Sequence, residues 1–211
     1  MKNIHGKIVV AFALLIALLF ACGCSGGSRK TAFQVAFCSL YINESAVTEY
    51  SAAAAKNIPE LTIDGTAPVF TTMIMGEAEN NIESGVLNDP MMGMAGMMKM
   101  AAVASTGDLD IFIGDMDNGA RQARGGMFLA LSDVYSAAEL SSFGDKLLSF
   151  DILKVDAYNS TPTGEKTPVC GINITGNAQM TKIFGSQEIG VFIMASTKHK
   201  DIARKLIGSL L

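Results

Sequence analysis

The sequence contains little histidine, no tryptophan and no excess of basic residues. Only two histidines occur in 211 residues, and His5 lies in the N-terminal leader, which leaves His199 between Lys198 and Lys200. Ser-His-Asp and Cys-His relays need a histidine held by neighbouring groups in a pocket, and a histidine between two lysines on a solvated turn is poorly suited to that role. Zinc sites built from histidine and cysteine are disfavoured by the same scarcity. We therefore expect no catalytic residues, no metal and no other cofactor.

The charge balance is equally informative. Sixteen lysines and arginines against twenty aspartates and glutamates give a net charge of −4. An acidic chain lacks the main electrostatic contribution to nucleic-acid binding, so no nucleic-acid partner is expected. Apolar residues make up 49% of the chain, which is typical of a globular protein and not of a disordered one.

The N-terminal 21 residues have the order of a secretory signal peptide: a basic start, an uncharged apolar run at 8–20, and small residues. The apolar run is shorter than the ~20 residues that span a bilayer. Residues 19–22 (LFAC) resemble a bacterial lipobox, in which the cysteine is acylated and becomes the mature N-terminus. The resemblance implies a lipid on Cys22, with Cys24 as the alternative, and simple secretion is the other interpretation.

After the leader, residues 22–31 are expected to be a lipidated flexible tether rich in glycine and serine, and 32–211 a single α/β domain. Strands are predicted at 33–38, 68–75, 109–114, 169–174 and 189–195. Helices are predicted at 43–57, 90–105, 118–124 and 136–150, and from Thr197 onward. Loops are expected at 76–89 and 159–164.

Alternating strands and helices predict a three-layer domain with a mainly parallel sheet of about five strands. Residues 33–38 and 109–113 are almost continuously apolar, which predicts that these two strands are central and parallel. Ile202, Leu206 and Leu210 share one face of the last helix, so this face should be buried.

Two sequence features allow more than one interpretation. Cys38 and Cys170 each lie in an apolar run, where buried small residues are the first interpretation and a disulfide between them is the second. Residues 91–100 contain six methionines. They predict a buried or half-buried helix, with an adaptable apolar contact surface or a Cu(I) site as the alternatives.

Polar residues follow two of the predicted strands. Ser39 and Tyr41 follow the first strand, and Asp115, Asp117 and Asn118 follow the third. Residues 115–119 fail the EF-hand spacing, so they either cap a helix or contact a ligand. Open α/β sheets bind ligands at the carboxyl ends of their strands, and we therefore predict a ligand site formed by these five residues. Two acidic residues favour a cationic or polyhydroxylated ligand.

Three motifs occur in an order similar to that of extracellular solute-binding proteins of ABC importers. These are residues 107–113 (GDLDIFI), 126–133 (GMFLALSD) and 190–207, a strand, a lysine-rich turn and a helix. The resemblance covers about half of the chain after the leader. It implies one lobe of a type 2 periplasmic-binding-protein fold, anchored by its lipid on the extracytoplasmic face of the cell membrane.

The chain also departs from that family. The stretch between 133 and 169 is too short for a second lobe, and without tryptophan the stacking platform of sugar-binding members is missing. The resemblance therefore implies a single-lobe solute-binding-like protein, with a small-molecule ligand or an ABC permease or sensor as partner. The alternative is a cell-surface lipoprotein that acts as an interaction module without small-molecule binding. An enzyme is the least favoured hypothesis.

Overall fold

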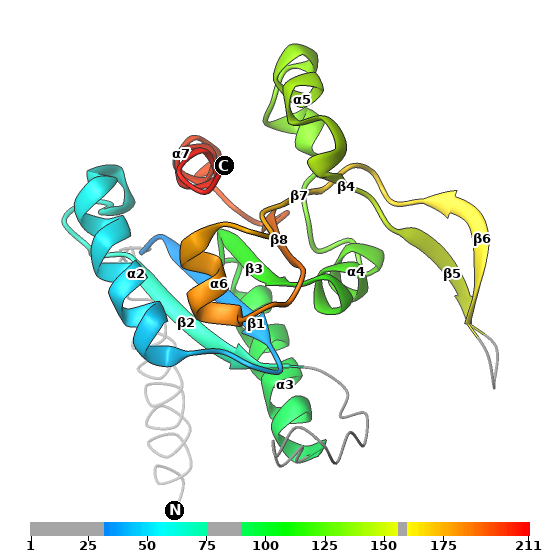
Figure 1. Cartoon of the computed structure of the whole chain (residues 1–211), viewed down its shortest axis with the longest axis horizontal. Helices are drawn as coiled ribbons and strands as arrows, with labels where there is room; N and C mark the ends of the chain where they lie inside the picture. Colours follow the sequence, from blue (N-terminus) through cyan, green and yellow to red (C-terminus); the bar gives the residue numbers. More distant parts are fainter. Residues whose placement is uncertain (1–31, 76–89, 156–159) are drawn as a thin grey trace, which may run out of the picture. The chain divides into compact units, whose positions relative to one another are not determined.

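A computed structural model describes residues 32–75, 90–155 and 160–211, which belong to one compact unit, 31–211. The expectations for the signal peptide, for Cys22 and Cys24, and for the loop at 76–89 lie outside the described residues. Figure 1 shows the order of the elements.

The strands are β1 (Gln34–Ser39), β2 (Val69–Ile74), β3 (Ile111–Asp115), β4 (Leu147–Leu148), β5 (Asp151–Val155), β6 (Ser160–Lys166), β7 (Gly171–Asn173) and β8 (Ile189–Ile193). The α-helices are α2 (Glu44–Asn57), α3 (Pro90–Thr106), α4 (Met116–Arg124), α5 (Ala137–Phe143), α6 (Ala178–Phe184) and α7 (Lys200–Gly208). The short 3-10 helices among the described residues are η1 (Pro59–Leu61), η3 (Leu131–Asp133) and η4 (Gly144–Lys146).

The main sheet has six strands in the order β2-β1-β3-β8-β7-β4. Strand β1 pairs in parallel with both β2 and β3, which confirms that β1 and β3 are central and parallel. The other three pairings, β3 with β8, β8 with β7 and β7 with β4, are antiparallel. The α/β class is therefore confirmed, but the sheet is mixed. Strands β7 and β8 are joined through the short helix α6, a connection that antiparallel neighbours permit.

Helices cover both faces of this sheet. On one face, α2, α6 and α7 pack against the side chains of Val35 and Phe37 in β1 and of Phe33, which precedes it. On the other face, residues of α3 and α4 join a second cluster with Ala36 and Cys38. Alternate residues of β1 thus point to opposite layers, as the two-residue period of a strand requires. The three-layer arrangement follows from this alternation.

The C-terminal helix packs as its sequence pattern predicts. Helix α7 begins at Lys200, three residues after the expected start, and Leu206 is buried in the α2–α6–α7 layer while Ile202 packs at its margin. The helix ends at Gly208, so Leu210 lies beyond it and not on its face, although Leu210 is buried in the same layer. Burial of this apolar face is the main source of stability for a nine-residue helix.

The predicted helix over 136–150 is wrong beyond residue 143. Helix α5 begins with a capping box between Ser136 and Glu139 and ends at Phe143. Gly144 has φ +56°, a left-handed conformation that side chains other than hydrogen disfavour, and it turns the chain out of the helix. Leu147 and Leu148, which lie within the predicted helix, instead form β4 and pair with β7.

The predicted surface loop over 159–164 is also wrong within its described part. Residues 160–166 form β6, which pairs with β5 as a separate two-stranded sheet (Figure 1). All seven residues of β6 are exposed. The segment has no alternation of apolar and polar residues, which is the pattern that would have predicted a strand. Pro162 fits at this position because the ribbon has an open edge.

Candidate functional site

The loops that follow β1 and β3 meet at one edge of the main sheet. The register pairs Phe37 with Ile113 and Cys38 with Gly114, so Ser39 and Asp115 end neighbouring parallel strands. Helix α2, which follows β1, packs on one face, and α4, which follows β3, contributes to the other. This divergence is the switch point at which open α/β sheets bind ligands. The structure thus brings the predicted site residues to one edge, which we call the sheet edge.

Two of these residues differ sharply in exposure. Ser39 is completely buried, and its hydroxyl donates a 2.6 Å hydrogen bond to Oε1 of Gln187. The Gln187 amide in turn donates to the Phe184 carbonyl at 2.8 Å and joins the end of α6 to the loop after β1. Ser39 is therefore occupied within the protein. The side chain of Tyr41 is 52% exposed and remains accessible to a ligand.

The residues of the acidic loop after β3 also differ in their exposure. Asp115 caps α4, because its Oδ1 accepts the Asn118 backbone N–H at 2.9 Å. Asn118 is buried, and its side-chain amide donates to Asp115 Oδ2 and to the Met75 carbonyl. The capping interpretation is confirmed for Asp115, and both Asn118 donors are used. Only Asp117 is exposed. Among the residues that the structure describes, the sheet edge therefore offers a ligand an aromatic face, from Tyr41, and the exposed carboxylate of Asp117.

The methionine-rich helix α3 is half-buried. Met100 lies in the core, whereas Met94, Met97 and Met98 are exposed at the spacing of one helix face. Gly96 lies against β2, because a Cβ there would be only 1.9 Å from the Ile74 carbonyl oxygen, so the three methionines face away from the sheet. The half-buried interpretation is confirmed, and the exposed face suits an adaptable apolar contact.

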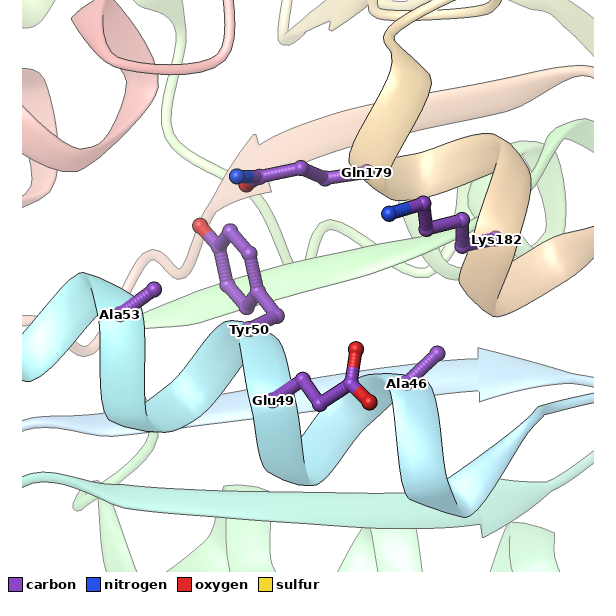
Figure 2. Close-up of a pocket in the computed structure, with 6 residues that line it drawn as sticks. All are labelled: Ala46, Glu49, Tyr50, Ala53, Gln179 and Lys182. Atoms are coloured by element: carbon purple, nitrogen blue, oxygen red, sulfur yellow. The ribbon is translucent and has the colours of Figure 1, made fainter.

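A pocket of about 190 Å³ lies between α2 and α6 (Figure 2). We call it the α2–α6 groove; it is lined by Ala46, Glu49, Tyr50, Ala53, Gln179 and Lys182. Side chains from both helices reach into the space between them (Figure 2). Burial raises the pKa of the Tyr50 phenol, so this hydroxyl keeps its proton.

The sequence analysis predicts no helix at the position of α6, and it therefore predicts no groove between α2 and α6. The signal was present, since Asn177 precedes apolar residues at 180, 183 and 184, the spacing of a short capped helix. The Asn177 side chain accepts hydrogen bonds from the backbone N–H groups of Gln179 and Met180. The pairing of α6 with α2 joins residues about 130 positions apart, which no local pattern specifies.

A larger hollow of about 630 Å³ lies beside α5 and α7, and its lining includes Tyr135, Arg204 and Lys205. Its basic groups are already engaged. The Arg204 guanidinium stacks over the Tyr135 ring at 4.9 Å and pairs with Glu139, and Lys205 pairs with Glu60 at 2.7 Å. Burial raises the pKa of Tyr135 to about 12. With its cations neutralised, this hollow offers mainly apolar surface to a ligand.

The remaining histidine does not lie on a solvated turn, so that expectation is wrong. His199 is mostly buried, its Nδ1 is 3.0 Å from Oδ1 of Asp110, and its ring lies 6.2 Å from that of Phe33. Asp110 also accepts hydrogen bonds from the Thr197 hydroxyl and the Gln34 backbone N–H. The cluster ties together the starts of β1 and β3 and the turn before α7.

The cysteines and the groups that could hold a metal are the other candidates for reactive chemistry. Cys38 and Cys170 are buried and free, as the first interpretation expected, and burial is the main cause that raises the pKa of both thiols. Over 32–75, 90–155 and 160–211, no group of three or more His, Cys, Asp or Glu side chains is placed to hold a metal ion. Methionine sulfurs are a different ligand set, so the copper interpretation stays a hypothesis.

Within the part of the chain that the structure describes, no helix has the length and apolar character needed to cross a membrane. Comparisons of the chain with protein-family models, with curated proteins and with solved structures found no match. The likeness to solute-binding proteins therefore depends on the sequence motifs alone.

Proposed function

We propose that this protein is a lipid-anchored, extracytoplasmic solute-binding-like protein with a single α/β lobe, acting with an ABC permease or sensor. The observation that carries the proposal is the sheet edge, where parallel strands β1 and β3 send α2 and α4 to opposite faces. Ligands bind at such switch points in open α/β sheets. The three sequence motifs support the family, and the lobe resemblance is part of the same proposal.

The free groups at the sheet edge support a particular kind of ligand. Tyr41 offers an aromatic face and Asp117 a carboxylate, while Ser39, Asp115 and Asn118 hold the loops in place. An aromatic face and a carboxylate attract a cation or a polyhydroxylated molecule. Because a single lobe leaves this edge open to water, affinity should be modest unless a second molecule covers it.

The proposal predicts that a bound solute depends on the two exposed residues. A thermal-shift screen of sugars, amino acids, peptides and metals identifies the solute, because a ligand that binds only the native state raises the unfolding midpoint. The double variant Tyr41→Ala with Asp117→Ala should weaken binding about tenfold or more, measured by calorimetry.

The control for this experiment is Glu165→Ala, an exposed carboxylate on β6. This variant should bind the solute as the parent does. If the double variant folds normally and keeps its affinity, the solute does not bind at the sheet edge. That result would favour the alternative function, an interaction module, for which the exposed methionines of α3 offer a contact surface.

Anchoring is tested separately. We expect mass spectrometry of the membrane fraction to find a diacylglyceryl group on Cys22, because two acyl chains hold a protein on a membrane stably and one does not. Cys22→Ser should release the protein from the membrane fraction, and Cys24→Ser should leave it there. A lipid on Cys24 would move the site, and an unmodified N-terminus at Ser25 or beyond would contradict lipidation.

A further inference from the structure

We propose that the outer face of α3 binds the lipid surface to which the protein is anchored, with its methionines at the boundary between headgroups and acyl chains. The outer face consists of the exposed apolar residues of α3, which are Met94, Ala95, Met97, Met98, Ala101 and Ala102. This inference rests on the lipid anchor proposed above and deepens it, because it says which side of the domain lies against the membrane. It does not depend on a solute at the sheet edge.

The first support is that α3 is apolar on its exposed side as well as on its buried side. The side that packs on the sheet consists of Gly96, Met100, Val103 and Ala104. The outer face lies opposite, and Lys99 is the only charged residue among the exposed positions from 94 to 106. A surface helix normally turns a charged face to water, and a helix that is apolar all round is covered on all sides. The outer face therefore requires an apolar partner.

The methionines suit a fluid partner. Met94, Met97 and Met98 are 58%, 37% and 68% exposed. Their unbranched thioether side chains adapt to irregular surfaces without a fixed shape. The outer face extends from 94 to 102, roughly 12 Å along the helix axis at ~1.5 Å per residue. A continuous apolar strip of this kind matches the face that an interfacial helix buries among lipids.

The second support is that cations border the outer face on both sides. At one border the Lys99 ammonium donates to the Thr72 carbonyl oxygen at 3.1 Å. At the other border, the Arg121 guanidinium of α4 donates to Sδ of Met97 at 3.4 Å. Helix α3 itself contains no aspartate or glutamate, although the whole chain has a net charge of −4. Basic residues beside an apolar face are attracted by lipid phosphates.

The third support is the length of the tether and the point where it joins the domain. Residues 22–31 join the proposed lipid to Ala32, just before β1. The Asp110 backbone N–H, four residues after the end of α3, donates to the Gln34 carbonyl at 3.0 Å, so α3 ends beside the start of β1. Ten residues extend at most ~36 Å, several times the ~10–12 Å thickness of a helix. The tether is therefore long enough for α3 to lie along the membrane.

The chain contains no tryptophan, so a single introduced tryptophan reports its own surroundings. Met98→Trp places this reporter on the outer face. Leu211→Trp is the matched control, because Leu211 is an exposed apolar residue that follows α7, which packs on the opposite face of the sheet from α3. Both lipidated proteins are purified from the membrane fraction and reconstituted into vesicles of phosphatidylcholine and phosphatidylglycerol, with and without brominated acyl chains.

We expect brominated lipid to quench the emission of Met98→Trp at least about twofold more than that of Leu211→Trp, because an interfacial helix face lies at the acyl boundary. Met94→Trp, a second reporter on the same face, should behave like Met98→Trp. Equal quenching of the outer-face reporters and the control would overturn the proposal. Emission that moves to shorter wavelength without quenching would mean that protein, such as a second copy of the chain, covers the face, and it would overturn the lipid assignment.

A charge placed on the outer face provides the second test. Met94→Asp in the Met98→Trp protein should reduce the quenching to the level of the control, because a carboxylate is disfavoured at the acyl boundary. Leu211→Asp in the same protein should leave the quenching unchanged. Strong quenching that Met94→Asp does not reduce would overturn the assignment to this face.

Mass spectrometry of the same samples separates this inference from the proposed anchor. A lipid on Cys22 or Cys24 together with equal quenching at both reporters would overturn the membrane contact of α3 and leave the anchor in place. An N-terminus without lipid would overturn the anchor and, with it, the membrane contact. A lipidated N-terminus with selective quenching at the outer face is the expected result.

Discussion

Asp110→Ala is expected to reduce the free energy of unfolding by about 3 to 5 kcal/mol, because it leaves several buried polar groups without their acceptor. Asp110 is 2% exposed and accepts from the Gln34 backbone N–H at 2.9 Å and from the Thr197 hydroxyl, with His199 Nδ1 at 3.0 Å. Denaturant unfolding followed by circular dichroism measures the loss as a lower midpoint.

Two other variants make the Asp110 result specific. Asp110→Asn keeps one carbonyl oxygen as an acceptor, so its loss should be smaller than that of Asp110→Ala. Asp108→Ala, two residues earlier and more exposed, should change stability by no more than ~0.5 kcal/mol. If Asp110→Ala were as mild as Asp108→Ala, the cluster would not hold the starts of β1 and β3 to the turn before α7.

Leu206→Ala is the second large effect, with an expected loss of about 2 to 5 kcal/mol. Leu206 has no exposed surface and lies in the layer where α7 packs with α2 and α6, together with Ile183 and Phe184. Truncating the side chain there leaves a cavity as well as lost burial, and neighbouring elements held by the sheet cannot fully close it.

Leu211→Ala is the control for that loss, because Leu211 is 46% exposed and should change stability by no more than ~0.5 kcal/mol. Both variants are measured by denaturant unfolding, and an unchanged slope would show that the denatured state is the same. A loss below ~0.5 kcal/mol for Leu206→Ala would contradict the packing of α7 against the core.

The elements that the sequence determined by itself are those with a strong local pattern. The apolar runs of β1 and β3 and the apolar face of α7 each have a short-range physical cause, and the structure agrees with all of them. The same reasoning also placed Ser39 and Asp115 at one sheet edge, because parallel strands end together. It did not show which of the site residues would be buried and engaged.

Only the tertiary structure decided the rest, because the deciding contacts join distant residues. Strand β8 enters the sheet antiparallel beside β3, and the exposed ribbon β5–β6 forms without any apolar alternation. Tyr50 and Lys182 line one groove only because α6 packs on α2, and His199 is mostly covered only because it lies beside Asp110. A local sequence pattern predicts which face of a helix or strand is apolar, whereas the fold decides which element packs against that face.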